Sequence, residues 1–214
     1  MKKLLSLLVL LTNICFAQTT PSQVLDMAAS YHDPNGEWKS LSTTLQFTET
    51  RPSGDDRKTT VVMNNSKSYM KVDRNSENIY EVSNESAEVL KGEHDEKQAL
   101  RMRNYYLYLW GLPMKLYDEG TPFDEEVAED QIEGKKCHVL RVVYEEDTWY
   151  FYIDQSSGRM LQYRFYKDEE AGKGELIKLE DEILVGQIKI PQKRSWYTLP
   201  EMKYLGTDIL IGSE

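Results

Sequence analysis

Short segments in which apolar and polar residues alternate, joined by short polar turns, most constrain what this chain can fold into. Leu41, Leu45 and Phe47 begin such a pattern, and from Phe123 it persists almost to the end of the chain. This period is that of a β-strand with one buried face. Parallel neighbours would need long crossovers, usually helices, and none separates the segments from Phe123 onward. The sequence therefore predicts a large antiparallel sheet.

The turns set the expected strand positions. Gly134-Lys135, Glu146-Asp147 and Gln155-Ser156-Ser157-Gly158 are short joints of the kind that link antiparallel neighbours. Strands are expected at 38–49, 59–63, 68–72, 78–82, 87–91, 125–132, 136–145, 148–154, 160–167, 175–185, 188–190 and near 208–211. No repeat or linker divides the chain, so one sheet of around ten strands is predicted.

Two segments have helical spacing instead. Residues 22–31 predict an N-terminal helix that Ser22 can cap, and residues 95–116 predict a second, inserted helix. Gly111 and Pro113 should end or kink the inserted helix. The segment beyond, through Leu116, is too apolar for a free loop and should fold back onto the core. The fold class is mainly β (α+β).

The first 17 residues have the pattern of a secretory signal peptide. Lys2 and Lys3 precede an apolar run that is too short to span a bilayer, and Cys15 and Ala17 are small residues at the −3 and −1 positions. Cleavage is expected after Ala17, leaving one domain over 18–214. Anchoring of a lipid on Cys15 is an alternative, but Ile14 precedes it where a small residue is required.

Charge and cysteine content limit the partners. Removing Lys2 and Lys3 takes the net charge from −10 to −12, which opposes binding to nucleic acid or to anionic membranes. No further segment could cross a membrane. Cys137 alone would remain, so the domain cannot form an internal disulfide, and a buried position on a strand is expected.

Catalytic and metal-binding patterns are scarce. His32, His94 and His138 have no spacing that suits a metal site, and no nucleophile or phosphate-loop motif occurs. His32-Asp33 is the one pair that could act in catalysis. The alternative is structural: a cationic His32 would favour the end of the helix, and Asp33 before a proline would close a turn.

The hairpin at 148–165 is apolar or aromatic on both faces. Trp149, Phe151 and Ile153 share one face of the first strand, and Tyr150 and Tyr152 share the other. Leu161, Tyr163 and Phe165 line one face of the next strand. A sheet covered on one side only should have a polar face. Two interpretations remain open: an ordinary core beneath the helices, or an apolar pocket for a ligand.

Several short motifs resemble a known family. His32-Asp33-Pro34 near the start and Gly111-Leu112-Pro113-Met114-Lys115-Leu116 after an aromatic helix resemble a family of uncharacterised exported bacterial proteins. The turn 154–158 and the segment 188–196 resemble the wider superfamily of outer-membrane lipoprotein carriers (LolA-like). The resemblance implies a strongly curved, incomplete barrel closed by helices, with an apolar cavity that shelters acyl chains and performs no catalysis.

The resemblance and the aromatic hairpin together predict a binding protein. We expect a non-enzymatic, monomeric protein of the periplasm or secreted by a Gram-negative bacterium, with no cofactor or metal. Its partner would be an apolar small molecule, a lipid or an acylated protein. The expected lining is aromatic, from Trp110, Trp149, Phe151, Tyr163 and Phe165. The alternatives are an interaction module with a filled core and an enzyme that uses His32 and Asp33.

Overall fold

The computed structural model describes residues 18–93 and 95–214. The predicted signal peptide, residues 1–17, lies outside the described residues, as does His94. Two α-helices, α1 (Pro21–His32) and α2 (Glu96–Asn104), accompany the strands, which dominate the fold. The mainly β architecture with an N-terminal and an inserted helix is therefore confirmed.

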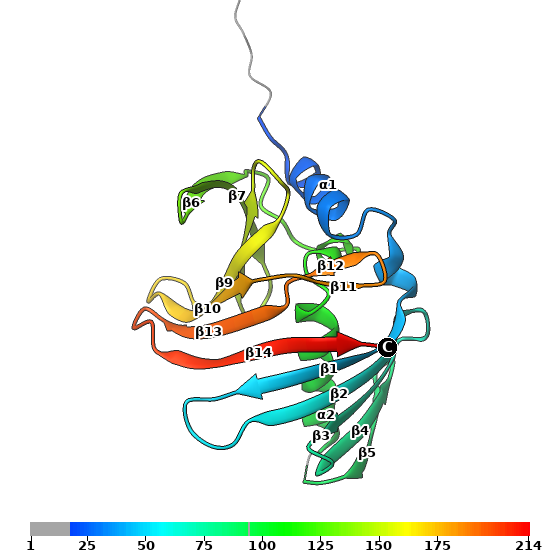
Figure 1. The fold of residues 1–214 in the computed structure, drawn as a ribbon. Coiled ribbons are helices and arrows are strands. Elements are labelled where there is room, and N and C mark those ends of the chain that lie inside the picture. Colours follow the sequence, from blue (N-terminus) through cyan, green and yellow to red (C-terminus); the bar gives the residue numbers. More distant parts are fainter. Residues whose placement is uncertain (1–17, 94) are drawn as a thin grey trace, which may run out of the picture.

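Twelve strands form one antiparallel sheet in the order β5-β4-β3-β2-β1-β14-β13-β10-β9-β8-β7-β6. Figure 1 shows this sheet bending round α2, with α1 lying beyond one end of the curve. The strands are β1 (Ser42–Thr50), β2 (Arg57–Asn64), β3 (Tyr69–Arg74), β4 (Asn78–Ser83), β5 (Ser86–Lys91), β6 (Ala128–Ile132), β7 (Lys135–Val143), β8 (Thr148–Asp154), β9 (Met160–Asp168), β10 (Lys173–Glu180), β13 (Lys193–Leu199) and β14 (Tyr204–Ser213).

The pairing of β14 with β1 joins two meanders into this one sheet. Strands β1 to β5 form the first meander, and β6 to β10 form the second. Strand β13 bridges β10 and β14. The last strand therefore lies near the middle of the sheet, and residues far apart in the sequence become neighbours there.

The predicted strand at 175–185 is wrong, because the structure divides it in two. Asp181 adopts a left-handed backbone conformation with φ of 53°, which ends β10. The chain then leaves the main sheet and forms a separate hairpin from β11 (Ile183–Val185) and β12 (Ile188–Ile190). Strand β13 was not predicted, since its buried residues Arg194 and Ser195 are polar.

The N-cap of helix α1 lies two residues earlier than expected. Thr20, rather than Ser22, is the N-cap, and Thr20 and Gln23 exchange side-chain and backbone hydrogen bonds in a capping box. The strand predicted at 38–49 also begins later than expected, at Ser42. Residues Glu37–Ser40 form a short 3-10 helix, because the Asp33 carboxylate accepts hydrogen bonds from the amides of Glu37 and Trp38.

The inserted segment is helical for only part of its predicted length. Helix α2 continues into a wider π-type turn (Tyr105–Leu109), and a 3-10 helix follows at Met114–Tyr117. Gly111 ends the pattern as expected and lies so close to Trp38 that an added Cβ would be 2.4 Å from its ring. Leu112 and Leu116 are buried, so the segment folds back onto the core as predicted.

Two apolar clusters fill the concave side of the sheet. The first includes Phe47 and Trp110, and it lies between β1–β5, the inserted segment and the β11–β12 hairpin. The second includes Phe151 and Tyr163, and it lies between β7–β10, α1 and the segment after Gly111. Tyr105 packs against both clusters. The inserted segment therefore connects the two halves of the interior.

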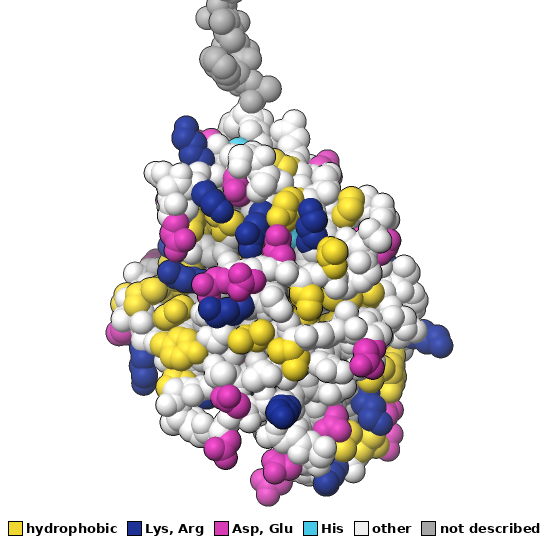
Figure 2. Space-filling model, viewed as in Figure 1, with side chains coloured by type: hydrophobic (Ala, Val, Ile, Leu, Met, Phe, Trp, Pro, Cys, Tyr) yellow, Lys and Arg dark blue, Asp and Glu magenta, His cyan; other side chains and the backbone are white. Residues whose placement is uncertain are grey.

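The outer surface carries mixed charges. Figure 2 shows acidic, basic and hydrophobic side chains interspersed on the face that it presents. Among residues 18–93 and 95–214, no helix has the length and apolar character required to cross a membrane.

Candidate functional site

Aligned strands bring an aromatic pair to the rim of the concave face. Trp149 on β8 is paired with Phe165 on β9, which is in turn paired with Glu175 on β10. Side chains at paired positions point to the same face of a sheet. The Trp149 and Phe165 rings stack with centroids 4.6 Å apart, and Phe165 remains half-buried. This aromatic wall is therefore partly open to solvent.

An apolar cleft of about 370 Å³ lies beside this wall. We call it the aromatic cleft, and define it by its lining residues Arg51, Tyr105, Leu109, Trp149, Phe165, Glu175, Trp196, Leu205 and Gly206. The π-type turn supplies Tyr105 and Leu109, and β13 supplies Trp196. Tyr105 and Trp196 stack with centroids 5.7 Å apart. Two stacked aromatic pairs therefore line one space.

A β-bulge directs Leu205 into the cleft. Trp196 pairs with Gly206 and the next residue, Tyr197, pairs with Tyr204, so Leu205 has no partner in the ladder. Such bulges re-aim side chains, often near functional sites. Gly206 has a φ of 149°, and a Cβ there would lie 2.5 Å from the Thr50 carbonyl oxygen and 2.8 Å from Arg51 Nη1. Only glycine allows this close approach.

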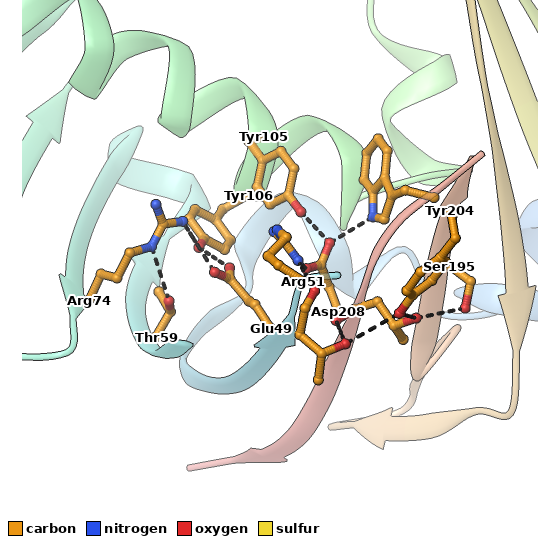
Figure 3. Close-up of polar contacts among 12 residues, drawn as sticks. Glu49, Arg51, Thr59, Arg74, Tyr105, Tyr106, Ser195, Tyr204 and Asp208 are labelled. Carbon is orange, nitrogen blue, oxygen red and sulfur yellow. Dashed lines mark hydrogen bonds and ion pairs between the residues drawn. The ribbon is translucent and has the colours of Figure 1, made fainter. Parts of the chain in front are cut away.

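A buried carboxylate holds the second aromatic pair in place. Asp208 has no exposed surface and accepts hydrogen bonds from Trp196 Nε1 at 2.7 Å, from Arg51 Nη1 at 2.9 Å and from the Tyr105 hydroxyl. Figure 3 shows Tyr105 and Arg51 converging on Asp208. Burial, reinforced by the neighbouring carboxylate, holds the pKa of Tyr105 well above its ordinary value. Tyr105 is therefore a hydrogen-bond donor throughout the physiological pH range.

Two charged residues, Arg51 and Glu175, line the aromatic cleft. Arg51 is neutralised by Asp208. The Glu175 side chain makes no hydrogen bond or ion pair with any residue of the described chain. Burial raises the pKa of Glu175, and Lys167 opposes that rise. The cleft therefore contains one half-buried carboxyl group that no protein group satisfies.

A larger, open groove of about 1090 Å³ adjoins the cleft along the inserted segment. Tyr105, Leu109, Trp149 and Phe165 line both spaces. The groove continues past them towards Lys167 and, on its other side, towards Trp38. A ligand in the cleft would therefore be in contact with solvent along one side.

The predicted lining residues divide into two layers. Trp149 and Phe165 line the aromatic cleft, whereas Trp110, Phe151 and Tyr163 are at most 1% exposed and lie in the core behind it. Tyr163 nevertheless supports the wall, since its ring stacks on Trp149 at 5.8 Å. Ligand binding by any of these residues stays a prediction.

Sequence reasoning did not include Tyr105, Trp196, Leu205 or Arg51. The aromatic content of 105–110 was a visible signal, but it was assigned to a regular helix. The other three come from the β1–β2 turn, β13 and β14, which meet only through the central pairing of the sheet. No local pattern in the sequence reports that juxtaposition.

A row of charged residues crosses the concave face below the cleft. Arg194, Asp208 and Glu49 occupy paired positions on β13, β14 and β1, and all three have no exposed surface. Glu49 accepts a hydrogen bond from the Tyr106 hydroxyl at 2.5 Å and lies 3.4 Å from Arg74 Nη2, as Figure 3 shows. These polar groups fill the space between the two apolar clusters.

Arg194 packs against the inserted segment. Its Nη1 donates to the Leu109 carbonyl oxygen at 2.5 Å, and its guanidinium carbon lies 4.1 Å from the centre of the Trp110 ring. Burying a charge without a counter-ion is costly, and a cation–π contact recovers part of that cost. The contact with Leu109 ties the π-type turn, and with it the rim of the cleft, to the sheet.

Family comparison places these features in context. Residues 2–213 match the model of a family of unknown function, DUF6503. The chain belongs to this family. No curated protein matches the sequence.

Solved structures establish the wider fold of this DUF6503 member. A LolA superfamily protein from Nitrosomonas europaea is similar with a TM-score of 0.59 and 11% identity, covering 92% of this chain and 93% of that one. A DUF1329 family protein from Desulfovibrio piger has a TM-score of 0.57 and 9% identity, and the match covers 90% of this chain and 92% of that one. A domain named as an outer membrane lipoprotein-sorting protein, from Vibrio parahaemolyticus, has a TM-score of 0.53 and 8% identity, and the match covers 90% of each chain. The fold is therefore LolA-like.

The His-Asp-Pro motif of this family member is structural in its geometry. His32 has no exposed surface; its Nδ1 donates to the Lys189 carbonyl oxygen at 2.7 Å, and its Nε2 accepts from the Met160 amide at 3.0 Å. Burial lowers the pKa of His32 to about 4. The expectation of a cationic ring at the helix end is therefore wrong, because the buried imidazole is neutral at pH 7.

Neither residue of the pair is placed to act on a substrate. Both ring nitrogens of His32 are engaged, and both carboxylate oxygens of Asp33 accept backbone hydrogen bonds from the 3-10 helix that follows. Asp33 thus closes the turn, as the structural alternative predicted. A general base needs a nitrogen within reach of a substrate proton, and His32 offers none.

The outer face of the aromatic hairpin is covered by arginine. The Arg164 guanidinium lies over the rings of Tyr150 and Tyr152 at 5.1 and 5.2 Å. Cys137 is buried in a small cluster on this face, as expected, beside Tyr152. Both faces of the hairpin are therefore covered over much of their length, and on the inner face Phe165 remains half-buried beside the aromatic cleft.

No group of histidine, cysteine, aspartate or glutamate side chains could hold a metal ion within residues 18–93 and 95–214.

Proposed function

We propose that this protein is an exported, non-enzymatic binding protein that takes a lipid, an acyl chain or another apolar molecule into the aromatic cleft. The observation that carries this proposal is the cleft itself. It is an apolar, aromatic-walled space that opens to solvent beside the buried core. Specific ligand sites are usually concave, mostly apolar and few per protein. The LolA-like fold supports the same class of function.

The volume limits the size of the ligand. About 370 Å³ is near the lower end of the range of roughly 300 to 1,000 Å³ that is usual for ligand sites. One acyl chain or one small apolar molecule suits this space better than the several chains of a whole lipoprotein. The adjoining groove would receive the part of the ligand that remains outside.

The site of action follows from the predicted signal peptide. We infer that residues 1–17 direct export and are removed, so that the mature monomer acts in the periplasm of a Gram-negative bacterium or after secretion. Mass spectrometry of the protein from the periplasmic fraction tests this inference. A mature N-terminus at Gln18 is expected, and an uncleaved chain or a lipid-modified Cys15 would contradict it.

Filling the cleft tests the proposed binding. Leu205→Trp places a large ring in the space, and Ile211→Trp adds the same ring at an exposed position, 54% accessible, on the same strand. Titration with a fluorescent fatty acid should show saturable binding for the natural protein and for the Ile211 variant. The Leu205 variant should bind at least tenfold more weakly, because its site is blocked.

The same titration separates the rival function. Absence of binding by the natural protein, together with a clean apo mass in native mass spectrometry, would favour an interaction module with a filled core. The burial of Trp110, Phe151 and Tyr163 is the observation that favours an interaction module. Equal binding by both tryptophan variants would place the ligand elsewhere.

A further inference from the structure

Glu175 is the one charged group of the aromatic cleft that lacks a partner. The other, Arg51, is held by Asp208 at 2.9 Å. No residue of the described chain forms a hydrogen bond or ion pair with the Glu175 side chain, although the residue is half-buried. Its carboxylate oxygens keep contact with solvent, but partial burial weakens their hydration. A carboxylate at this position in a ligand cleft is therefore available to a donor group of the ligand.

The neighbours of Glu175 favour a cation as that donor. Phe165 is its paired neighbour on β9, and Trp149 continues the same row on β8. Trp196 and Tyr105 form the second stacked pair of the same cleft. Aromatic faces attract cations, and an aromatic enclosure is a recurrent way of binding organic ammonium groups. The rings and the carboxylate therefore both favour a positive charge on the ligand.

Neither of the nearby cationic side chains, Lys167 and Arg51, is the donor to the Glu175 carboxylate. Lys167 influences Glu175 electrostatically but makes no ion pair with it, and it lines the outer groove rather than the cleft. Arg51 lies against Gly206 on β14, two strands from β10, which corresponds to roughly 10 Å between backbones. The net charge of −10 for the whole chain also attracts cations rather than anions.

We propose, resting on the proposed function, that the ligand is an amphiphile with an ammonium head group. Its ammonium donates hydrogen bonds to the Glu175 carboxylate among the aromatic rings, and its alkyl chain lies against Trp149, Phe165 and Leu205. An anionic amphiphile would instead place its charge against Glu175. A neutral one, such as an alcohol, would donate at most an uncharged hydrogen bond, which is weaker than a charge-assisted one.

Three ligands of equal chain length test the head group. Binding of decylamine, decanol and decanoate, each kept below its micelle concentration, is measured by calorimetry and by tryptophan fluorescence, since Trp149 and Trp196 line the cleft. Decylamine should bind about tenfold or more tightly than decanol, which corresponds to one charge-assisted hydrogen bond. Decanoate should bind most weakly. Decyltrimethylammonium has the same charge but no N–H donor. Weaker binding of this ligand than of decylamine would show that hydrogen bonding contributes beyond cation–π attraction.

Glu175→Gln removes the charge with little change in shape. The amine should lose about tenfold or more in affinity, decanol should change little, and decanoate should bind more tightly. Glu180→Gln is the matched control, because Glu180 is an exposed residue of the same strand that pairs with Lys193. It should leave all three affinities unchanged.

The outcomes separate this inference from the proposed function. If no decyl ligand binds, the proposed function fails as well. If all three bind with similar affinity, or if Glu175→Gln leaves their order unchanged, the cleft binds apolar chains and the ammonium inference is wrong. Circular dichroism and the unfolding midpoint of each variant establish that it is folded before affinities are compared.

Discussion

Two buried polar side chains in this protein, Asp208 and His32, have specific partners that explain their positions. Asp208 accepts three hydrogen bonds, and His32 uses both ring nitrogens to join α1 to the β12 and β9 strands. Each group would be costly to bury alone. Their effect on stability should therefore depend on pH and on which partner is removed.

The stability of the protein should fall as the pH falls through the range of His32. Its pKa is about 4 in the folded protein and about 6.5 when unfolded, so the unfolded chain binds the extra proton first. The contribution is fully present above about pH 6.5, and roughly 3 kcal/mol is lost by pH 4. Urea unfolding at several pH values between 7 and 4 measures this loss.

A variant isolates His32 from the carboxylates that titrate in the same range. His32→Gln can still donate to Lys189 and accept from Met160, but it carries no proton equilibrium. The difference in unfolding free energy between natural protein and variant should shrink as the pH falls. His138→Gln, on the half-exposed β7 position, should keep the natural pH dependence. A parallel pH dependence for His32→Gln would contradict the assignment.

At the scale of elements, the capping box fixes where α1 begins. Thr20→Ala removes the hydroxyl that accepts from the Gln23 amide, and it should lower the free energy of unfolding by about 1 kcal/mol. Ser22 is exposed and lies two residues after Thr20, so Ser22→Ala should change stability by much less. Chemical denaturation of both variants checks this, and equal effects would argue against the observed cap.

The β8–β9 turn depends on a glycine for close packing. Gly158 has a φ of 82°, and a Cβ there would lie 2.4 Å from the Met27 carbonyl oxygen of α1. Gly134 has a similar φ of 85° with nothing within 4 Å. Gly134→Ala should cost about 1 to 2 kcal/mol for its conformation, and Gly158→Ala a further 1 to 3 kcal/mol for the clash. Thermal or urea unfolding of the pair measures the difference, and equal losses would contradict it.

Strand β13 shows why part of the fold was not predictable from the sequence. Apolar and aromatic segments bounded by short turns predicted β8 and β9 well, because their partners are adjacent in the chain. In β13 the buried positions carry Arg194 and Ser195, which are typical of a surface. Their burial depends on partners in the inserted segment and β14, and no local period reports such partners. The candidate site divides in the same way: Trp149 and Phe165 were predictable, whereas Trp196 was not.

At the scale of the whole molecule, the β1–β14 pairing joins the first and the last strand of the chain. It places the two meanders on either side of one seam and brings Arg51, Trp196 and Leu205 to the aromatic cleft. The sheet still has two edges, β5 and β6. Helix α2 packs against β5, whereas β6 is bonded on one side only and four of its five residues are exposed.

Charges on β6 should keep the protein monomeric. Glu129 and Asp130 lie on this exposed edge, and two copies pairing there would bring like charges together. Light scattering after gel filtration should give a monomer. Glu129→Gln with Asp130→Asn should associate measurably as concentration rises. Glu125→Gln with Glu126→Gln makes the same charge change in the preceding exposed loop and should not. A dimeric natural protein, or association that is equal in both double variants, would show that edge charge does not decide the oligomeric state.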